Sequence, residues 1–412
     1  MRNRDVFSQS RKFQSENVNP KNVTKADLIV GIPSYNEADN IAFVAGICNE
    51  GILKYFPDCQ AAIINVDNNS PDDTRAAFLN AKTTVPKIYI STPSGVKGKG
   101  NNFFNLFCEA KRLGAKKVVV VDADLRSITP EWIRDLALPL MEGYDFVTPL
   151  YSRNEYDGTI TNTICYPLIL GLLSKDIRQP IGGEFGFSGK YVDYILSQPW
   201  HETTRQYGID IFMTLNAILG GFEICKVGLG AKIHKPSAPK LGPMFTQVVD
   251  TLFKTLISNK SHWFSSNGGV NELPLHGKVE FSQPQSLSVD YKEMKATAQC
   301  GFSISQEVLA STLEPSVYEK LALMYKKGRI DIGINLWARI VYDFLYAYEF
   351  DANNANLVEA LKPLYFGRVI SFIRKTLDMD YISSENEIQR QAKHFYKIRR
   401  SLIRKYSKKE VA

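Results

Sequence analysis

Two aspartates one residue apart, Asp122 and Asp124, follow directly on a run of four valines, Val118–Val121. A carboxylate at the end of a buried strand is costly unless a charge or a metal compensates it. At a strand-to-loop junction the backbone turns, so both carboxylates are able to approach one ligand. Oxygen ligands of this kind suit Mg²⁺ or Mn²⁺ bound to phosphates. We therefore expect a divalent metal here, although such a pair alone more often only caps a turn.

A glycine-rich stretch, GVKGKGNN, precedes a predicted helix and contains Lys97 and Lys99. Backbone N–H groups, a helix N-terminus and an ammonium group together form a typical anion cradle. The Walker pattern is absent, because no Gly-Lys pair is followed by serine or threonine at the required spacing. We expect metal and lysine to share the binding of phosphates.

The segment DNNSPDDT ends another predicted strand with Asp67. Its later residues fit a helix start, with Ser70 as the N-cap and Pro71 at the first helical position. Asp67 lies before that start and is available either to a nucleobase edge or to its own loop.

Three further residues are ambiguous by themselves. His234 in GAKIHKP follows a predicted strand and either completes a carboxylate metal site or is structural. Glu184 in QPIGGEF and Asp210 in QYGID each lie close to glycine, where the backbone is able to approach a ligand. Each motif alone is also typical of an ordinary turn.

The elements that must position these residues alternate from Asp27 onward between short β-rich runs and longer helical runs. This succession predicts βαβ units and a mostly parallel, Rossmann-like sheet with helices on both faces. Ligands bind at the carboxyl ends of such strands, and the polar clusters follow the first four of them at one edge. The predicted strands are 28–34, 61–67, 87–91, 117–122 and 145–151.

After about residue 285 only helical periodicity remains, which predicts a C-terminal all-α region. Its aromatic faces favour packing on the first domain or on another subunit, hence a homo-oligomer. The predicted organisation is a polar N-terminal tail (1–26), a catalytic domain (27–266), a linker (267–290) and a helical domain with a basic tail (291–412).

Composition excludes several classes of protein. The chain has 412 residues, 44% of them hydrophobic, a net charge of +7, no signal-peptide pattern and no apolar run long enough to span a bilayer, so we expect a cytoplasmic protein. Six cysteines without CxxC spacing indicate reduced thiols. No segment is typical of nucleic-acid binding. The basic stretch KIRRSLIRKYSKKE favours a solvated helix face over an acidic partner or a membrane surface.

Together these clusters predict an enzyme that binds a nucleoside diphosphate through a divalent metal, and a nucleotide-sugar glycosyltransferase is the natural class. The motifs GIPSYNE, DNNSPDDT, GKGNN, DADLRSITPEWI, QPIGGE, YGID and IHKP also occur in a known order. In that order the chain resembles, from about residue 27 to its end, the retaining GT-A transferases that include mannosylglycerate synthase, glucosylglycerate synthase and glucosyl-3-phosphoglycerate synthase.

The resemblance implies a role for each matching residue. Asp124 and His234 would ligate the metal, Asp210 and Tyr207 would lie at the reacting centre, and Arg153 and Thr161 would bind the acceptor. The nucleotide and the sugar would be held by Pro33, Tyr35, Glu37, Asp67, Lys99, Asp122, Gly183 and Glu184.

The implied reaction is transfer of glucose or mannose to D-glycerate, with retention, to give an α-glycosylglycerate compatible solute. Relatives that use 3-phosphoglycerate have an arginine at the position of Thr159, and a neutral threonine cannot pair bidentately with a phosphate. Transfer to 3-phosphoglycerate and an inverting family-2 transferase with Asp210 as base remain the alternatives, although no QxxRW signature is present. A sugar nucleotidyltransferase would need a glycine-rich opening where IPSYNE stands.

Overall fold

The structure is a computed structural model that describes residues 13–235, 241–264, 268–277, 290–351 and 353–410. Its contacts divide the chain into two compact units, each made of segments that alternate along the sequence. Within the described residues, the first unit takes 13–153, 179–235 and 273–277, and the second takes the rest. The predicted domain limits, 27–266, 267–290 and 291–412, stay a prediction.

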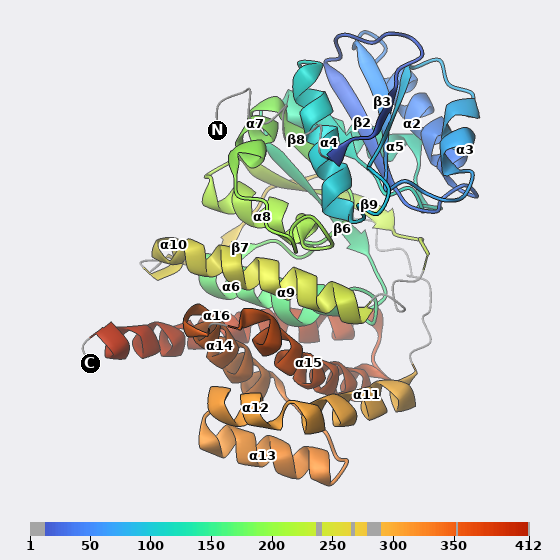
Figure 1. The fold of residues 1–412 in the computed structure, drawn as a ribbon. Helices are drawn as coiled ribbons and strands as arrows, with labels where there is room; N and C mark the ends of the chain where they lie inside the picture. The colour runs from blue at the N-terminus through green and yellow to red at the C-terminus, as the bar shows by residue number, and fades with distance from the viewer. Residues whose placement is uncertain (1–12, 236–240, 265–267, 278–289, 352, 411–412) are drawn as a thin grey trace. The chain divides into compact units, whose positions relative to one another are not determined.

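The first unit is an α/β layer structure (Figure 1). Its elements are β1 (Glu16–Val18), β2 (Leu28–Ser34), α2 (Ile41–Tyr55), β3 (Ala61–Asp67), α3 (Thr74–Asn80), β4 (Lys87–Ser91), α4 (Lys99–Arg112), β5 (Lys117–Val120), α5 (Pro130–Met141), β6 (Phe146–Ser152), β8 (Phe185–Ser188), α7 (Gly189–Ser197), α8 (Ile209–Leu219), β9 (Ile224–Ala231) and β11 (Leu275–His276).

Within the described residues, the main sheet has nine strands in the order β1-β4-β3-β2-β5-β8-β6-β9-β11. The central pairs β2–β3, β3–β4, β2–β5 and β6–β9 are parallel, whereas β8 runs antiparallel to both of its neighbours. Every residue of β2 is buried, as expected for a strand covered on both faces. The predicted mostly parallel sheet is confirmed.

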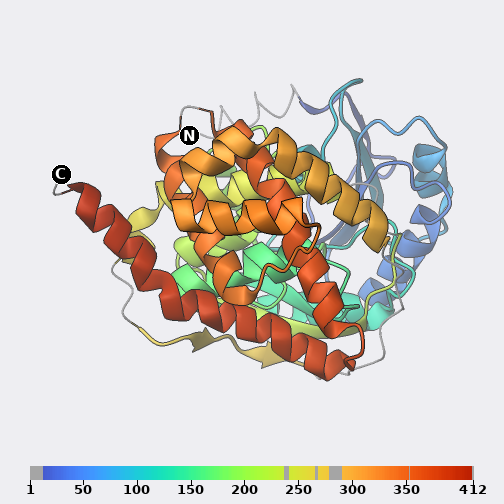
Figure 2. The ribbon, with the colours of Figure 1, turned by 90° about the horizontal axis from the view of Figure 1, so that it is seen from below.

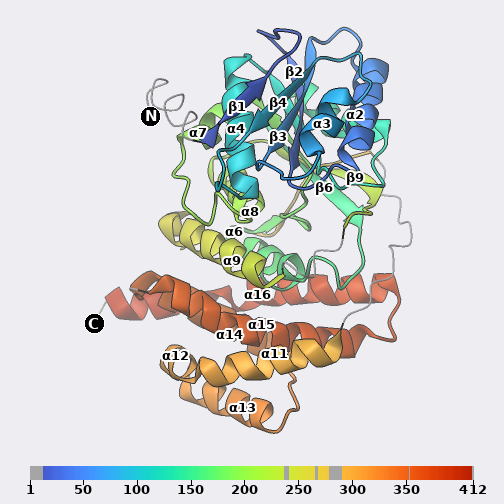
Figure 3. The same cartoon turned by 45° about the vertical axis from the view of Figure 1, so that its right-hand side comes forward.

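Helices cover both faces of this sheet, and Figure 3 shows the two layers on either side of the strands. The helices α2 and α5 pack on each other, and α5 also packs on β5, β6 and β9, whereas α4 packs on β2 and β3. The buried apolar residues between the sheet and α2, α3 and α5 form one core. The carboxyl ends of β2, β3 and β5 are therefore held rigidly at one edge.

The second unit is helical, and Figure 2 shows its long helix α16 along one side. Its elements are the π-helix η1 (Thr161–Cys165), α6 (Tyr166–Leu173), β7 (Lys175–Asp176), α9 (Leu241–Ser258), α10 (Lys260–Phe264), β10 (Asn271–Glu272), α11 (Tyr291–Ile304), α12 (Gln306–Thr312), α13 (Pro315–Lys326), α14 (Ile334–Phe350), α15 (Asn354–Thr376) and α16 (Tyr381–Glu410). The predicted C-terminal helical region is confirmed.

None of the helices in the described residues is long and apolar enough to cross a membrane.

Candidate functional site

The turn that carries the two aspartates is fixed by hydrogen bonds from the first βα loop. Asn40 lies just before α2, and its Nδ2 donates to the carbonyl oxygens of Ala123 at 2.8 Å and Leu125 at 2.9 Å. These bonds hold the backbone on both sides of Asp124. The predicted strand-to-loop junction therefore exists, and it is anchored to the neighbouring strand's loop.

Asp122 lies between two lysines. Its Oδ1 is 3.0 Å from Lys99 Nζ at the start of α4, and its Oδ2 is 3.1 Å from Lys232 Nζ just after β9. Burial alone would raise the pKa of this carboxyl, but the two ammonium groups outweigh it and hold the pKa well below its usual range. Asp122 is therefore a fixed negative charge.

Lys99 also reaches Asp210, the acidic residue in the first turn of α8. The Nζ of Lys99 is 3.4 Å from Asp210 Oδ1, while Asp210 Oδ2 accepts a hydrogen bond from the Gly183 N–H at 3.1 Å. Burial, opposed by Lys99 and reinforced by Asp122, raises the pKa of Asp210. The structure thus brings Lys99, Asp122, Gly183 and Asp210 together.

Glu184 lies beneath this cluster, fully buried. Its two carboxylate oxygens are 3.0 and 2.8 Å from Lys232 Nζ, and the hydroxyl of Tyr151 donates to it. Lys232 also donates to the Gly182 carbonyl oxygen at 2.8 Å. Glu184 therefore binds the ammonium group of Lys232, which in turn pairs with Asp122.

Gly183 has a backbone φ of +91°, and a Cβ built there would lie 2.2 Å from Asp122 Oδ2 and 2.8 Å from Lys232 Nζ. Gly183→Ala is therefore expected to displace this ion pair and to lower the free energy of unfolding by about 1–3 kcal/mol, the usual cost of a strained backbone. Turnover should fall with it. Gly143→Ala is the matched control, since it also has a positive φ, +104°, but meets nothing within 4 Å. An equal loss of turnover in both variants would contradict this reading.

The pKa of Glu184 is raised from 4.5 to about 7, because burial penalises its charged form, Lys232 offsets this only in part and Asp122 adds to it. Between these two values the unfolded chain binds fewer protons than the folded one. The free energy of unfolding should therefore decline as the pH rises through this window.

Denaturant unfolding at several pH values measures that decline, and Glu184→Gln should flatten it. Glu131→Gln is the control, because hydrogen bonds from Tyr55 and Lys54 lower the pKa of Glu131 to about 2 and its effect falls at more acidic pH. An unchanged slope in Glu184→Gln would exclude Glu184 as the source.

The predicted metal ligands also lie together. His234 Nδ1 is 4.0 Å from Asp124 Oδ2, and both side chains are partly buried. The two segments are joined by the Arg126 N–H, which donates to the Ile233 carbonyl at 2.9 Å, and by the Ile233 N–H, which donates to Ser127 Oγ at 2.9 Å. The turn after β5 and the segment after β9 are thus held side by side.

This donor set fits Mg²⁺ or Mn²⁺ only in part. One carboxylate and one imidazole are available, and no group of three or more His, Cys, Asp or Glu side chains in the described residues is placed to hold a metal. Both cations accept additional oxygen ligands and commonly share them with phosphates. The pair therefore suits a metal that arrives with a diphosphate better than a metal held by protein alone.

Asp67 is buried and its carboxylate is already satisfied. Oδ1 accepts hydrogen bonds from Ser34 Oγ at 2.8 Å and Ser70 Oγ at 2.7 Å, and Oδ2 accepts them from the Ser70 N–H and the Tyr89 hydroxyl. The expectation that Ser70 caps a helix is wrong, because α3 begins only at Thr74 and Ser70 instead closes the loop onto Asp67.

The expected anion cradle at the start of α4 is also wrong in its backbone part. The N–H groups of Gly100 and Asn101 donate to the carbonyl oxygens of Gln206 and Arg205 at 3.1 and 3.0 Å. A Cβ at Gly100 would lie 2.1 Å from the Thr204 carbonyl oxygen, so the glycine permits this close packing. The helix start holds the loop before α8, and the Lys99 side chain from this segment pairs with the carboxylates of Asp122 and Asp210.

The remaining predicted nucleotide residues lie near the end of β2 or just after it. Pro33 is within the strand, the Tyr35 hydroxyl accepts a hydrogen bond from Lys97 Nζ at 3.0 Å, and Glu37 Oε2 is 2.7 Å from Lys235 Nζ. Burial, opposed by Lys235 and reinforced by Asp124, raises the pKa of Glu37. Glu37 therefore lies within electrostatic reach of the predicted metal pair.

The other predicted residues are placed as follows. Tyr207 lies in the turn before α8, and Arg153 lies just after β6 in the first unit. Thr161 begins η1 in the second unit and is buried. Thr159 is buried in the same unit, where its hydroxyl is 2.5 Å from that of Tyr365 on α15.

Sequence reasoning missed Lys232, Lys235 and Tyr151. Both lysines flank His234 in GAKIHKP. A lysine at the end of a strand is normally solvated, so the sequence pattern assigned no role to either one. The signal was their position, one on each side of the predicted metal ligand.

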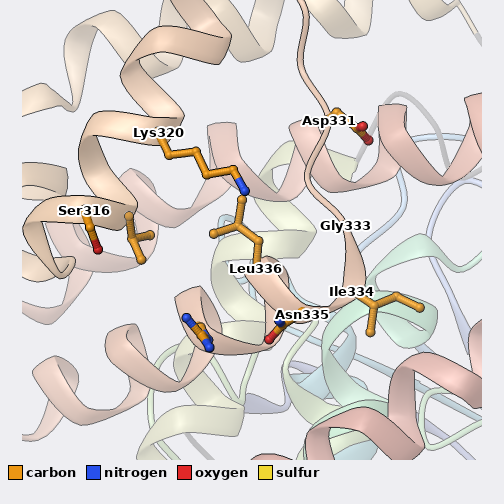
Figure 4. Close-up of a pocket in the computed structure, with 9 residues that line it drawn as sticks. Ser316, Lys320, Asp331, Gly333, Ile334, Asn335 and Leu336 are labelled. Atoms are coloured by element: carbon orange, nitrogen blue, oxygen red, sulfur yellow. The ribbon is translucent and has the colours of Figure 1, made fainter.

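The helical unit has a hollow of about 610 Å³ (Figure 4). It includes the cationic side chains of Lys320 and Arg339, and Asp331 at its rim is 2.8 Å from Arg374. None of the predicted site residues lines it.

The family model described as "Mannosylglycerate synthase, GT domain" matches residues 68–241. No curated protein matches the chain. Among solved structures, the chain is similar to glucosyl-3-phosphoglycerate synthase from Mycobacterium tuberculosis.

The structure of that synthase with Mg²⁺ and uridine-diphosphate has 24% sequence identity and a TM-score of 0.46, over 56% of this chain and 79% of that one. Its structure with Mn²⁺, uridine-diphosphate and glucosyl-3-phosphoglycerate has 25% identity and a TM-score of 0.46, over 56% and 80%.

The matched segment 68–241 contains Asp122, Asp124, Glu184, Asp210 and His234. This match confirms the predicted resemblance to transferases of the mannosylglycerate synthase type and the predicted class of enzyme, a nucleotide-sugar-dependent hexosyltransferase.

Proposed function

We propose that this protein is a metal-dependent, retaining transferase that moves glucose or mannose from a nucleoside-diphosphate sugar to D-glycerate. The observation that carries the proposal is the junction of two features at one sheet edge. Lys99, Asp122 and Asp210 form a partly buried ion-pair cluster, and Asp124 lies beside His234. The domain match supports the same reaction class.

In this proposal Asp124 and His234 hold Mg²⁺ or Mn²⁺ together with the donor's diphosphate. A cation held there would supply positive charge to the departing diphosphate. Lys99 supplies a positive charge at the same edge, and the burial of its carboxylate partners strengthens each of these interactions. Tyr35, Glu37 and Asp67 lie on the neighbouring strand ends, where the nucleoside would extend.

Asp210 acts as an orienting group in the mechanism that we favour. Its carboxylate is held by the Gly183 N–H and by Lys99, and it is 4% exposed. A carboxylate fixed in this way is suited to orient the sugar or the acceptor, while a donor phosphate oxygen takes the acceptor's proton on the same face. Mass-spectrometric trapping of a covalent glycosyl adduct on Asp210 would contradict this route.

The proposed acceptor is unphosphorylated glycerate. Thr159 is neutral and buried, and its hydroxyl is bonded to Tyr365. It therefore offers no cation to a second, phosphate-bearing end of the acceptor. Arg153 and Thr161 are the proposed partners of the glycerate carboxylate and hydroxyl groups.

The test is a matrix of purified protein, Mg²⁺ or Mn²⁺, three donors (GDP-glucose, UDP-glucose and GDP-mannose) and two acceptors (D-glycerate and 3-phosphoglycerate). Products are identified by mass and by the anomeric NMR signals. An α-linked product from D-glycerate alone is the expected result. Turnover only with 3-phosphoglycerate would overturn the proposed acceptor, and a β-linked product would overturn retention. No turnover with either acceptor would overturn the proposed transfer to a glycerate-type acceptor.

A further inference from the structure

The segment after β9 places His234 between two ion-pair anchors. On one side, Lys232 binds Asp122 and Glu184. On the other side, Lys235 Nζ is 2.7 Å from Glu37 Oε2 and 2.9 Å from Asp39 Oδ1. The two anchors engage different segments. Lys232 binds the turn after β5 and the residue just before β8, whereas Lys235 binds the loop after β2.

The anchor at Lys235 differs in kind from the one at Lys232. Lys232 is buried and its removal would disturb the core of the site, whereas the Lys235 side chain is 36% exposed. The backbone bonds of Ile233 fix the segment against the Ser127 loop on the N-terminal side of His234. On the C-terminal side of His234, the Lys235 side chain ties the segment to the first βα loop.

The ion pairs of Lys235 with Glu37 and Asp39 also change the local charge. Glu37 lies within electrostatic reach of Asp124 and Asp39, because burial first and then these two carboxylates raise its pKa, against the effect of Lys235. Lys235 neutralises part of this negative charge and, as the residue next to His234, joins that part of the segment to the loop after β2. A residue that orients a metal-binding histidine in this way belongs to the group of outer partners whose loss weakens metal binding.

We infer that Lys235 is a positioning residue that sets the affinity of the site for its divalent cation, through the location of His234. This inference rests on the proposed function. It assigns to Lys235 no contact with sugar or acceptor, so its effect should appear in metal binding and in the metal concentration needed for half-maximal activity.

The test measures Mn²⁺ binding directly, by the electron paramagnetic resonance signal of free Mn²⁺, in the presence of GDP or UDP and without any acceptor. Lys235→Met is expected to weaken Mn²⁺ binding by about tenfold, the lower end for loss of an outer partner. Lys235→Arg keeps a cation within reach of both carboxylates and should stay within about twofold of wild type. Lys54→Met is the control, because Lys54 also pairs with a carboxylate, Glu131 at 3.0 Å, on an exposed surface.

Two outcomes separate this inference from the proposed function. If wild type binds Mn²⁺ and Lys235→Met binds it equally well, the inference is wrong and the metal site stands. If Asp124→Ala binds Mn²⁺ as well as wild type does, or if neither protein binds it, the proposed metal site itself is wrong. A melting temperature measured for each variant identifies any loss that comes from unfolding, and a weakened Lys235→Arg variant would also count against the inference.

Discussion

Asp124→Ala and His234→Ala are each expected to lower turnover by about a thousandfold, because a metal that stabilises the leaving diphosphate contributes several kcal/mol to the transition state and about 4 kcal/mol corresponds to that factor. The two side chains are 4.0 Å apart and provide the carboxylate and the imidazole of the proposed site. Neither one is part of the apolar core, so the fold should persist. Product formation with the best donor and acceptor pair, after chelation and return of Mg²⁺, measures the effect.

Matched controls are available in the same unit. Asp193→Ala removes an aspartate that is 2.6 Å from Lys111 on the surface, and His276→Ala removes a histidine whose Nδ1 is 3.4 Å from Glu142. Both controls should keep wild-type turnover. Near-wild-type turnover of Asp124→Ala or His234→Ala under these conditions would remove the metal from the proposed mechanism.

The placement of Asp67 and Asp122 at one edge of the sheet was predictable because it follows from the order of the strands alone. The carboxyl ends of β2, β3 and β5 lie at one edge of a parallel sheet, so residues that end those strands must converge. Asp67 and Asp122 both follow this rule. Lys99 lies at the same edge because α4 begins there, but its pairing with Asp122 was not predicted, since we expected this lysine to bind phosphates.

The backbone partners at the start of α4 were not predictable in the same way. A glycine-rich helix start has free N–H groups unless another segment reaches them. Here the carbonyls of Arg205 and Gln206 reach them, from a loop about a hundred residues later in the chain. No local pattern in GKGNN indicates that partner, so the sequence favoured an anion where the fold has placed protein.

Lys232 was missed for a related reason. Its partners Asp122 and Glu184 are 110 and 48 residues away in the sequence. Spacing within a helix or strand predicts local neighbours, whereas this network forms only when β5, β8 and β9 meet. The sequence indicated three carboxylates at one edge without indicating how their charge is balanced. Buried carboxylates require compensating positive charge, and Lys99 and Lys232 provide it.

The second large effect is expected at the buried ion pair of Lys232 and Glu184. Lys232→Met is expected to lower the free energy of unfolding by about 3–5 kcal/mol at pH 8, the usual cost of removing one partner of a buried ion pair. The Lys232 side chain is 4% exposed and that of Glu184 is 0% exposed, so water cannot replace the lost ammonium. Denaturant unfolding of wild type and variant measures the difference.

The loss should depend on pH. Glu184 already has a pKa of about 7, raised by burial, and without Lys232 its carboxyl should take up a proton more readily. At pH 5 the neutral acid needs no cation, so Lys232→Met should cost less there than at pH 8. A purely steric role for the lysine would give the same loss at both values.

A double-variant comparison isolates the pair itself. Glu184→Gln in the Lys232→Met background removes the stranded charge, so the two losses should not add, with a coupling of about 0.5–3 kcal/mol. Lys54→Met is the surface control, and its exposed pair with Glu131 should contribute no more than about 1 kcal/mol. Additive losses at pH 8 would mean that Lys232 is held by Asp122 alone, and that Glu184 serves the site in some other way.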